Sequence, residues 1–415
     1  MGKVRVALLG AGNRGKDAYG PYALRFPEDI EFVAVAEPMQ DRREAFAKAH
    51  NIPKENQVET YEKLLNRNKF CDAMMICTQD DMHFIPTKTA IEKGYHVLLE
   101  KPMSNSLEEC MELGKIAREN DVVFMICHVL RYTPFFTKIK EIIDSGKIGK
   151  VMTIQHNENI GYFHMAHSFV RGNWRNSKES SPIILAKTCH DMDILLFLAG
   201  SRCKKISSFG SLTYFRESNA PANAADRCID CEHEPSCIYS AKAQYLKARG
   251  MWPATTITED QTEEGILKAL AEGLYGRCAY KCDNDVCDHQ VVNMEFENGI
   301  TSTFNLSAFT NNCNRTLKIM GTRGEIRAND LMQEVEVQLF GQDSKEIFKC
   351  KPVGGHGGGD YGLMADFVRL IQSGKNDALT SADISVESHV MAFAAENSRV
   401  NGVSVNLEEF YRLNS

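Results

Sequence analysis

Residues 4–15 read VRVALLGAGNRG, a short apolar run followed at once by three glycines with the spacing GxGxxG. The apolar run is too short for a helix and predicts a strand that is buried on both faces. Glycines at this spacing permit a tight turn and let the backbone approach a pyrophosphate, whose charge lies at the N-terminus of the next helix. The expected phosphate-binding residues are Gly10, Gly12, Asn13, Arg14 and Gly15.

A second apolar run, residues 31–36, ends in Glu37 and predicts the next strand. An acid at this place accepts hydrogen bonds from the adenine ribose hydroxyls of NAD and repels the 2′-phosphate of NADP. Arg42 and Arg43 follow close behind and could bind that phosphate instead. We therefore expect NAD as the cofactor, with NADP as the alternative.

Apolar runs alternate with helical stretches through the first third of the chain. The runs at 73–77, 97–99 and 122–127 predict three more strands, and the alternation is typical of a doubly wound parallel sheet. Ligands bind such sheets beyond the carboxyl ends of the strands. The polar residues at those ends are Thr78, His83, Glu100, Lys101, His128, Arg131 and Tyr132. We expect the first four beside the cofactor and the last three beside a substrate, although Arg131 could be only a structural ion-pair partner.

The chain has 415 residues, which is long for a single core and predicts two domains. Its net charge of -7 provides no basic surface for nucleic acid. No apolar run approaches the roughly 18 residues of a membrane span. The first strand begins directly after the N-terminus, without a signal peptide. We therefore expect a cytoplasmic enzyme that binds neither nucleic acid nor membrane.

The second part of the chain has short alternating runs separated by turn signals, which predict a meander of strands. The expected strands are 151–157, 291–296, 299–305, 317–320, 325–328 and 335–340, and the expected helices near the C-terminus are 360–373 and 381–399. We expect a dinucleotide-binding domain over residues 1–126 and an α/β domain over residues 127–415. The α/β domain would carry a cysteine-rich insert at about 217–282.

Several of these motifs together resemble those of the glucose-fructose oxidoreductase and inositol dehydrogenase (Gfo/Idh/MocA) family. The matching stretches are 10–15, Glu37, 78–83, 100–102 and 190–193. The resemblance implies an N-terminal Rossmann domain and a C-terminal α/β domain, whose open, largely antiparallel sheet commonly forms homo-oligomers. It also implies that Lys101 lies near nicotinamide and substrate, and that His190 is the catalytic acid/base.

Residues 182–200 predict a helix that carries His190 near its start. Many dehydrogenases of the family have an aspartate four residues before the matching histidine, where this chain has Ala186. Lys187 is adjacent and could take over part of the aspartate's role in catalysis, or it could be a solvated lysine. Asp191, next to the histidine, is a candidate for substrate binding.

The stretch 162–175 is crowded with aromatic and hydrogen-bonding side chains. Aromatic rings pack against the C–H faces of a sugar, and polar groups bind its hydroxyls. We favour sugar binding here over a packed loop. A second candidate segment is the glycine-rich stretch 354–360, which could close over the site or be a flexible link. The expected substrate-binding residues in these two stretches are His164, His167, Arg171, Trp174, Arg175 and His356.

Fourteen cysteines in a chain expected to be cytosolic indicate thiols or metal ligands rather than disulfides. Six of them fall within residues 228–287. A CxxC pair with two further thiols fits a tetrahedral zinc ion, which would stabilise an insert without a core of its own. The expected ligands are Cys228, Cys231, Cys237 and Cys278, with Cys282 as a substitute. An iron–sulfur centre and unligated thiols are the alternatives.

We expect an NAD-dependent oxidoreductase that transfers hydride between nicotinamide and a hydroxyl-bearing carbon of a carbohydrate or cyclitol. Lys101 or His190 would remove the hydroxyl proton, with Lys101 favoured because the positive nicotinamide weakens its hold on a proton. The alternative is a redox-neutral glycoside hydrolase or lyase that acts through a 3-keto sugar, with His164, His167 and Lys187 as extra acid–base groups. A redox-sensing or scaffolding protein is least favoured, because Lys101 and His190 are both present.

Overall fold

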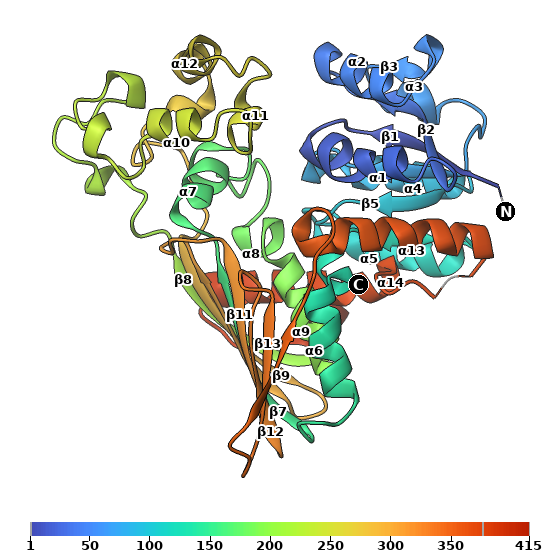
Figure 1. Cartoon of the computed structure of the whole chain (residues 1–415), viewed down its shortest axis with the longest axis vertical. Helices are drawn as coiled ribbons and strands as arrows, with labels where there is room; N and C mark the ends of the chain where they lie inside the picture. Colours follow the sequence, from blue (N-terminus) through green and yellow to red (C-terminus); the bar gives the residue numbers. More distant parts are fainter. Residues whose placement is uncertain (1, 376, 415) are drawn as a thin grey trace.

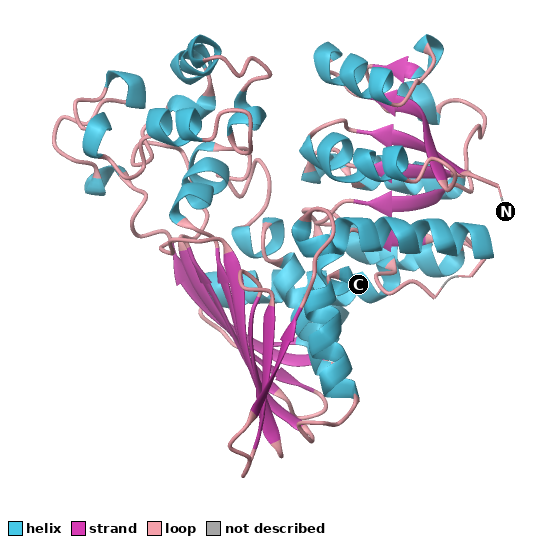
Figure 2. Ribbon diagram, in the orientation of Figure 1, coloured by secondary structure: helices cyan, strands magenta, loops and turns pink. Residues whose placement is uncertain are grey.

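The first sheet is parallel and has six strands in the order β3-β2-β1-β4-β5-β6 (Figures 1 and 2). The computed structural model describes residues 2–375 and 377–414. The strands are β1 Val4–Leu9, β2 Ile30–Ala36, β3 Gln57–Val58, β4 Ala73–Ile76, β5 His96–Leu99 and β6 Phe124–Ile126. The chain moves outward from β1 to β3 and then resumes at β4 on the other side of β1. The glycine turn after β1 therefore lies at the switch point of the sheet, where dinucleotides bind.

The second sheet has nine strands in the order β14-β13-β12-β11-β7-β10-β9-β8-β15. Its neighbouring strands are antiparallel except for β7 and β10, which are parallel. The strands are β7 Val151–Asn159, β8 Cys203–Ser211, β9 His289–Phe296, β10 Thr301–Ser307, β11 Asn314–Gly321, β12 Gly324–Asn329, β13 Glu334–Leu339, β14 Lys345–Lys349 and β15 Val405–Asn406. The two sheets confirm the predicted fold class.

Helices cover the first sheet and pack on the second, where α6, α9 and α14 contact its strands. Side-chain caps begin several of these helices. The Ser106 side chain accepts a hydrogen bond from the backbone N–H of Glu109 at the start of α5, and Thr133 caps α6 ahead of Pro134. The helices are α1 Gly20–Arg25, α2 Gln40–Ala49, α3 Glu62–Leu65, α4 Phe84–Glu92, α5 Leu107–Glu119, α6 Pro134–Asp144, α7 Tyr162–His164, α8 Ile183–Ala186, α9 Cys189–Ala199, α10 Ala241–Lys247, α11 Ala254–Ile257, α12 Glu263–Glu272, α13 Gly359–Ser373, α14 Ala382–Asn401 and α15 Leu407–Leu413.

The C-terminal part of the chain returns to the first sheet through α13. Leu363, Met364 and Phe367 of this helix are buried in the same core as Val6 and Leu8 of β1. Figure 1 shows the red α13 lying along the Rossmann sheet. The core of the nucleotide-binding half thus includes a helix from far along the chain.

The cysteine-rich insert leaves the second sheet after β8 and returns before β9. It carries α10, α11 and α12 and lies at the upper left of Figure 1, across from the first sheet. Its own core is small. The buried apolar residues of that core are Cys228, Ala241, Tyr245, Ala254, Ile266 and Leu270. None of the described helices is both long and apolar enough to cross a membrane.

Residues 182–200 do not form one helix, and that prediction was wrong. Helix α8 ends at Ala186 and α9 begins at Cys189. The hydroxyl of Thr188 donates to the carbonyl oxygen of Ile184 at 3.0 Å, a side-chain bond that competes with regular helix hydrogen bonding. The break leaves the carbonyl group of Ala186 accessible to a side chain from another element.

Candidate active site

The glycine turn is closed against the strands on one side and open on the other. Gly10 has φ +92°, and a Cβ atom there would lie 2.5 Å from the carbonyl oxygen of Cys77. A Cβ atom on Gly15 would lie 2.4 Å from the carbonyl oxygen of Gly10, whereas one on Gly12 would meet nothing within 4 Å. Asn13 begins the helical turn Asn13–Tyr19 directly after this open position. The turn therefore has the space that a pyrophosphate needs.

Glu37 lies at the end of β2, against the glycine turn. Its carboxylate accepts hydrogen bonds from the backbone N–H groups of Ala11 at 2.8 Å and Met39 at 3.0 Å. The guanidinium of Arg43 donates to the carbonyl oxygens of Glu37 at 2.5 Å and Pro38 at 3.2 Å. Arg43 is thus occupied by the backbone, and the group that faces the turn is a carboxylate.

Arg14 and Glu100, both expected at the cofactor, form a buried ion-pair network. Arg14 Nε lies 2.6 Å from Glu100 Oε1, and Arg14 Nη2 lies 2.9 Å from Asp360 Oδ1. Burial opposes the charge on Arg14, but Tyr19 and both carboxylates raise its pKa well above the usual value. The other oxygen of Glu100 accepts the backbone amide of Lys101 at 2.9 Å. The network therefore holds the backbone of Lys101 in place.

His356 extends this network into the glycine-rich stretch before α13. Its Nδ1 lies 3.0 Å from Arg14 Nη1 and 3.0 Å from Asp360 Oδ2, and its side chain is about half exposed. The structure thus brings the glycine-rich stretch against the end of β5.

Thr78 and His83 shape the backbone around Lys101. The ring nitrogens of His83 lie 2.7 Å from the carbonyl oxygen of Pro102 and 3.1 Å from that of Thr78. The Thr78 hydroxyl donates to the carbonyl oxygen of Met82 at 3.1 Å. His83 is buried and connects the ends of β4 and β5.

Lys101, just after the carboxyl end of β5, lies near His190 of α9. Lys101 Nζ donates to the carbonyl oxygen of Ala186 at 2.8 Å, at the break between α8 and α9. His190 is 8% exposed, and its buried Nδ1 has no hydrogen-bond partner in the described part of the chain. Burial, followed by the charges of Lys101 and His128, lowers the pKa of His190 well below 6.5. The site therefore combines an amine with a neutral imidazole, the groups that proton transfer needs.

The three predicted substrate residues after β6 have different surroundings. The buried His128 ring lies 5.8 Å from the His190 ring, measured between centroids. Arg131 makes a two-pronged ion pair with Asp193, with both N–O distances 2.7 Å. Tyr132 donates to a carboxylate of α13 at 2.8 Å. The polar groups of Arg131 and Tyr132 therefore bind protein. Arg131 is a structural ion-pair partner, which was the alternative that the sequence left open for it.

A buried row of alternating charges lies near His190. Lys187 Nζ is 3.1 Å from Glu158 Oε1, Glu158 Oε2 is 2.8 Å from Arg315 Nη2, and Arg315 Nε is 2.7 Å from Asp191 Oδ1. Glu158 and Arg315 were not singled out from the sequence. Each lies just outside a predicted strand of the second sheet and belongs to no recognisable motif. They are direct partners in the register of β7 and β11, which only the sheet topology reveals.

The stretch 162–175 is helical at its start rather than a loop, and all residues of the turn Met165–Arg171 are buried. The ring of His164 contacts Trp252 of the insert, with centroids 4.9 Å apart. Burial, followed by the charges of Lys187, His167 and Lys101, lowers the pKa of His164 well below its usual value. His164 therefore lies near the catalytic candidates. The ring of His167 instead stacks on Tyr275 of the insert at 4.8 Å.

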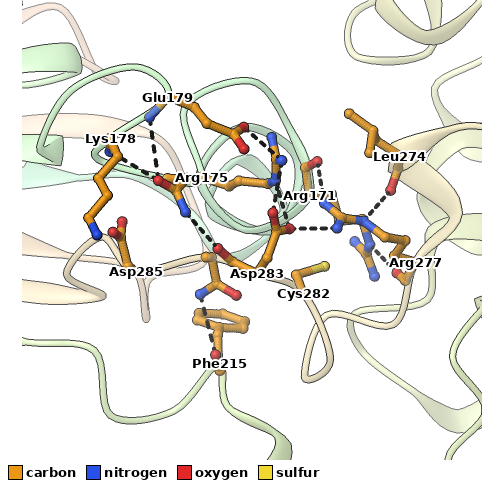
Figure 3. A network of polar contacts seen from close by, with 12 residues as sticks. Arg171, Arg175, Lys178, Glu179, Phe215, Leu274, Arg277, Cys282, Asp283 and Asp285 are labelled. Atoms are coloured by element: carbon orange, nitrogen blue, oxygen red, sulfur yellow. Dashed lines mark hydrogen bonds and ion pairs between the residues drawn. The ribbon is translucent and has the colours of Figure 1, made fainter.

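Two arginines of this stretch anchor the insert (Figure 3). The Arg171 side chain donates to the carbonyl oxygen of Arg277 at 2.7 Å. Arg175 makes a two-pronged ion pair with Asp283 at 2.8 and 2.9 Å, and Arg277 binds the same carboxylate at 2.5 Å. These guanidinium groups were expected to contact a sugar, but their partners in the structure are protein groups.

Trp174 connects the same stretch to the first sheet. Its indole N–H donates to Asp80 Oδ1 at 3.4 Å, and the hydroxyls of Ser180 and Ser181 each donate to Asp80 Oδ2 at 3.2 Å. Asp80 lies in the turn four residues after the end of β4, so Trp174 lies at the ligand-binding edge of the sheet.

All fourteen cysteines are free thiols. Within residues 2–375 and 377–414, no three His, Cys, Asp or Glu side chains are arranged to hold a metal ion. The zinc expected at Cys228, Cys231, Cys237 and Cys278 therefore stays a prediction.

Family models match both halves of the chain. Residues 4–128 match the NAD-binding Rossmann fold of the oxidoreductase family GFO_IDH_MocA, and residues 140–407 match its C-terminal alpha/beta domain. The chain belongs to the Gfo/Idh/MocA family of oxidoreductases. The resemblance seen in the sequence is confirmed, and residues 4–128 form an NAD-binding Rossmann domain.

The individual relatives are distant. The chain is 22% identical over 415 residues to the Bacillus subtilis (strain 168) protein YteT, described only as an oxidoreductase, with 95% of each chain covered. It is 26% identical over 210 residues to a 2,7-anhydro-N-acetylneuraminate hydratase of Mediterraneibacter gnavus, covering 51% of this chain and 53% of that one. A levoglucosan dehydrogenase solved with NADH and L-sorbose has the same fold, with a TM-score of 0.73 and 17% identity over 98% of this chain and 99% of the other.

Proposed function

We propose that this protein transfers hydride between NAD and a hydroxyl-bearing carbon of a carbohydrate or cyclitol. The observation that carries the proposal is the hydrogen bond of Lys101 to the Ala186 carbonyl, four residues before His190, whose buried Nδ1 lacks a partner among the described residues. Lys101 follows the carboxyl end of β5 in the NAD-binding domain, where the reacting end of the cofactor would be expected, and His190 comes from α9 of the C-terminal domain.

The residues of the site would divide the proton transfer between them. NAD⁺, when bound, supplies the hydride acceptor. Lys101 takes the hydroxyl proton as the C–H bond breaks, so the alcohol loses a proton and a hydride and becomes a carbonyl. His190, neutral because its pKa is lowered by burial and then by neighbouring cations, orients the same hydroxyl. The Ala186 carbonyl, 2.8 Å from Lys101 Nζ, holds the amine in position.

The substrate class follows from the groups around these two residues. His164 offers a ring nitrogen and Trp174 offers an aromatic face beyond the end of β4. Lys187 and Arg315 are paired with Glu158 and would bind a hydroxyl with their remaining N–H groups. Hydroxyls and C–H faces on one ring are what such a mixture binds. The fold shared with a levoglucosan dehydrogenase is consistent with a sugar substrate.

A redox-neutral reaction is the second candidate. Such an enzyme oxidises the sugar at C3, eliminates or adds a group next to the ketone, and returns the hydride. One relative is named as a hydratase of an anhydro sugar, which is a reaction without net oxidation. Ala186, at the position of a family aspartate, and the extra groups His164 and Lys187 also favour this candidate.

Two parallel assays distinguish the candidates. In one, the protein and excess NAD⁺ are mixed with free sugars and cyclitols, and NADH absorbance is followed. In the other, the protein and catalytic NAD⁺ are mixed with aryl glycosides, and aglycone release is followed. Stoichiometric NADH from a free sugar or cyclitol supports net oxidation. Aglycone release without NADH accumulation supports the redox-neutral reaction, and no turnover in either assay would contradict both.

The oligomeric state is a separate proposal. We expect a homo-oligomer, a dimer or a tetramer, because the nine-stranded sheet is open and the sheets of this family commonly form such contacts. Light scattering coupled to size exclusion measures it directly, and a monomeric mass would contradict the expectation.

A further inference from the structure

Four of the six cysteines within residues 228–287 line one small cavity, of about 20 Å³. They are Cys228, Cys231, Cys237 and Cys278. A space of this size holds about one water-sized guest. The four that share the cavity are the CxxC pair and the two further thiols that a tetrahedral thiolate site would use.

His233 and Glu234 also line the cavity, and each has one polar atom in a hydrogen bond. His233 Nε2 lies 2.7 Å from the carbonyl oxygen of Ala222. Glu234 accepts a hydrogen bond from the hydroxyl of Ser240 at 2.7 Å. The cavity also has four sulfur atoms, and a set of four sulfurs selects a thiophilic ion such as zinc.

Two of the sulfur atoms have backbone N–H groups beside them. The backbone of Tyr239 hydrogen-bonds Cys237, and the backbone of Tyr280 hydrogen-bonds Cys278. In both cases the donor lies two residues after the cysteine. Hydrogen bonds of this kind orient metal-bound thiolates and disperse their negative charge.

A buried cation also lies at the cysteines. Arg171 is fully buried, and its Nη2 is 3.6 Å from Cys228 Sγ. Its Nη1 is buried without a hydrogen-bond partner among the described residues. A zinc ion with four thiolates carries a net charge of about -2, so a guanidinium beside it is electrostatically favourable.

We propose that Cys228, Cys231, Cys237 and Cys278 bind one zinc ion that stabilises the insert. Binding releases the four thiol protons and forms four Zn–S bonds without a change of oxidation state. Among the described residues, no three potential ligands are arranged to hold a metal ion. Zinc binding would therefore bring the four sulfur atoms closer together, to about 2.3 Å from the ion. The inference does not depend on the reaction proposed at Lys101.

The composition of the insert explains why an ion would be needed. Its own core contains only six buried apolar residues. A core of this size contributes little stability, and small units of this kind commonly rely on a metal. The anchors at Arg171 and Arg175 fix one side of the insert, and the zinc would fix the loops that carry the cysteines.

The zinc content of the full-length protein tests the proposal. After purification without added metal, elemental analysis should find a single zinc ion per chain. Cys231→Ser and Cys278→Ser should lose it, whereas Cys282→Ser should keep it, because Cys282 belongs to the same insert but does not line the cavity. Replacing the zinc with Co²⁺ should produce the intense visible bands of tetrahedral cobalt thiolate.

The measurement on the unaltered protein does not depend on whether the variants fold. Folded protein without zinc, as judged by circular dichroism, would overturn the proposal. Iron with inorganic sulfide, or a disulfide between two of the four cysteines, would overturn it as well. So would full zinc content in both ligand variants. Loss of zinc from Cys282→Ser alone would assign the site to other cysteines.

Discussion

Lys101 and His190 are the side chains that we place at the reacting atoms, and their role can be separated from cofactor binding. Lys101→Ala and His190→Ala should each lower kcat by ~10²–10⁴-fold, the usual contribution of general acid–base catalysis. NAD binding, followed by fluorescence titration, should remain, because the glycine turn and Glu37 are unchanged. Lys150→Ala, at an exposed position, is the control. Normal turnover in either test variant would remove that residue from the mechanism.

Glu37 should make the protein prefer NAD(H) to NADP(H). Its carboxylate lies against the glycine turn, and Arg43 is occupied by two carbonyl groups. Glu37→Ala should therefore narrow the difference between the two dissociation constants, whereas Glu31→Ala, on the same strand but more exposed, should not. Tighter NADPH binding by the unaltered protein would mean that Arg42 or Arg43 reaches the ribose and that Glu37 has another role.

Single residues were predictable where a strand end alone decides their place. Lys101 follows a short apolar run, and the structure places it directly after β5, with its amine on the carbonyl oxygen of Ala186. Arg131 follows a strand end in the same way, but its partner Asp193 lies 62 residues further along the chain, and no local pattern indicates that pairing. The ion pairs of Glu158 with Lys187 and Arg315 could not be predicted either, because these residues are also far apart in the sequence.

At the scale of elements, the ion pairs around Arg14 connect β5 to α13. Glu100→Ala would leave the Arg14 charge without its partner at 2.6 Å in a largely buried place. Removing one member of a fully buried pair costs about 3–5 kcal/mol. Arg14 is 24% exposed and keeps Asp360 as a partner, so the free energy of unfolding should fall by less, about 1–3 kcal/mol. Chemical denaturation measures it. Asp377→Ala, which breaks an exposed pair with Arg369, should cost less than about 1 kcal/mol. Equal effects of the two substitutions would contradict the structural role of the network.

Strands were easier to predict than the elements that shape the site. Residues 4–9 form β1 as predicted, since a buried parallel strand leaves an unmistakable apolar run. The helix expected at 182–200 is broken, because Thr188 bonds back to Ile184, and this break presents the Ala186 carbonyl to Lys101. Hydrophobic periodicity carries no information about such side-chain bonds.

For the whole molecule, buried histidines predict a loss of stability in acid. Burial is the main cause that lowers the pKa of His167 and of His389 to about 3, from 6.5. The unfolded chain therefore binds more protons below pH 6.5, and stability falls as the pH falls from 6.5 toward 3. One such histidine costs about 2 kcal/mol at pH 5. The thermal midpoint should thus be lower at pH 5 than at pH 7.5, with a smaller difference in His389→Gln. Equal midpoints in the unaltered protein would contradict the buried neutral state.

The two-layer plan of the molecule was predictable, but its connections were not. Alternating runs indicated a parallel sheet followed by a mainly antiparallel one, and both are present. The return of α13 to the core of β1 joins segments that are more than 350 residues apart in the chain, and no sequence pattern encodes that contact. The same helix carries Asp360, which completes the network around Glu100.

The central claim is that hydride passes between a sugar carbon and nicotinamide at Lys101. Its most direct test is a single-turnover experiment, in which the protein with equimolar NAD⁺ is mixed rapidly with a panel of sugars, cyclitols and glycosides while reduced nicotinamide is followed by absorbance. We predict that reduced nicotinamide forms with at least one substrate class, persisting in a net oxidation and decaying in a redox-neutral reaction, and that Lys101→Ala forms none. Conversion of a substrate without any reduced nicotinamide would contradict the claim.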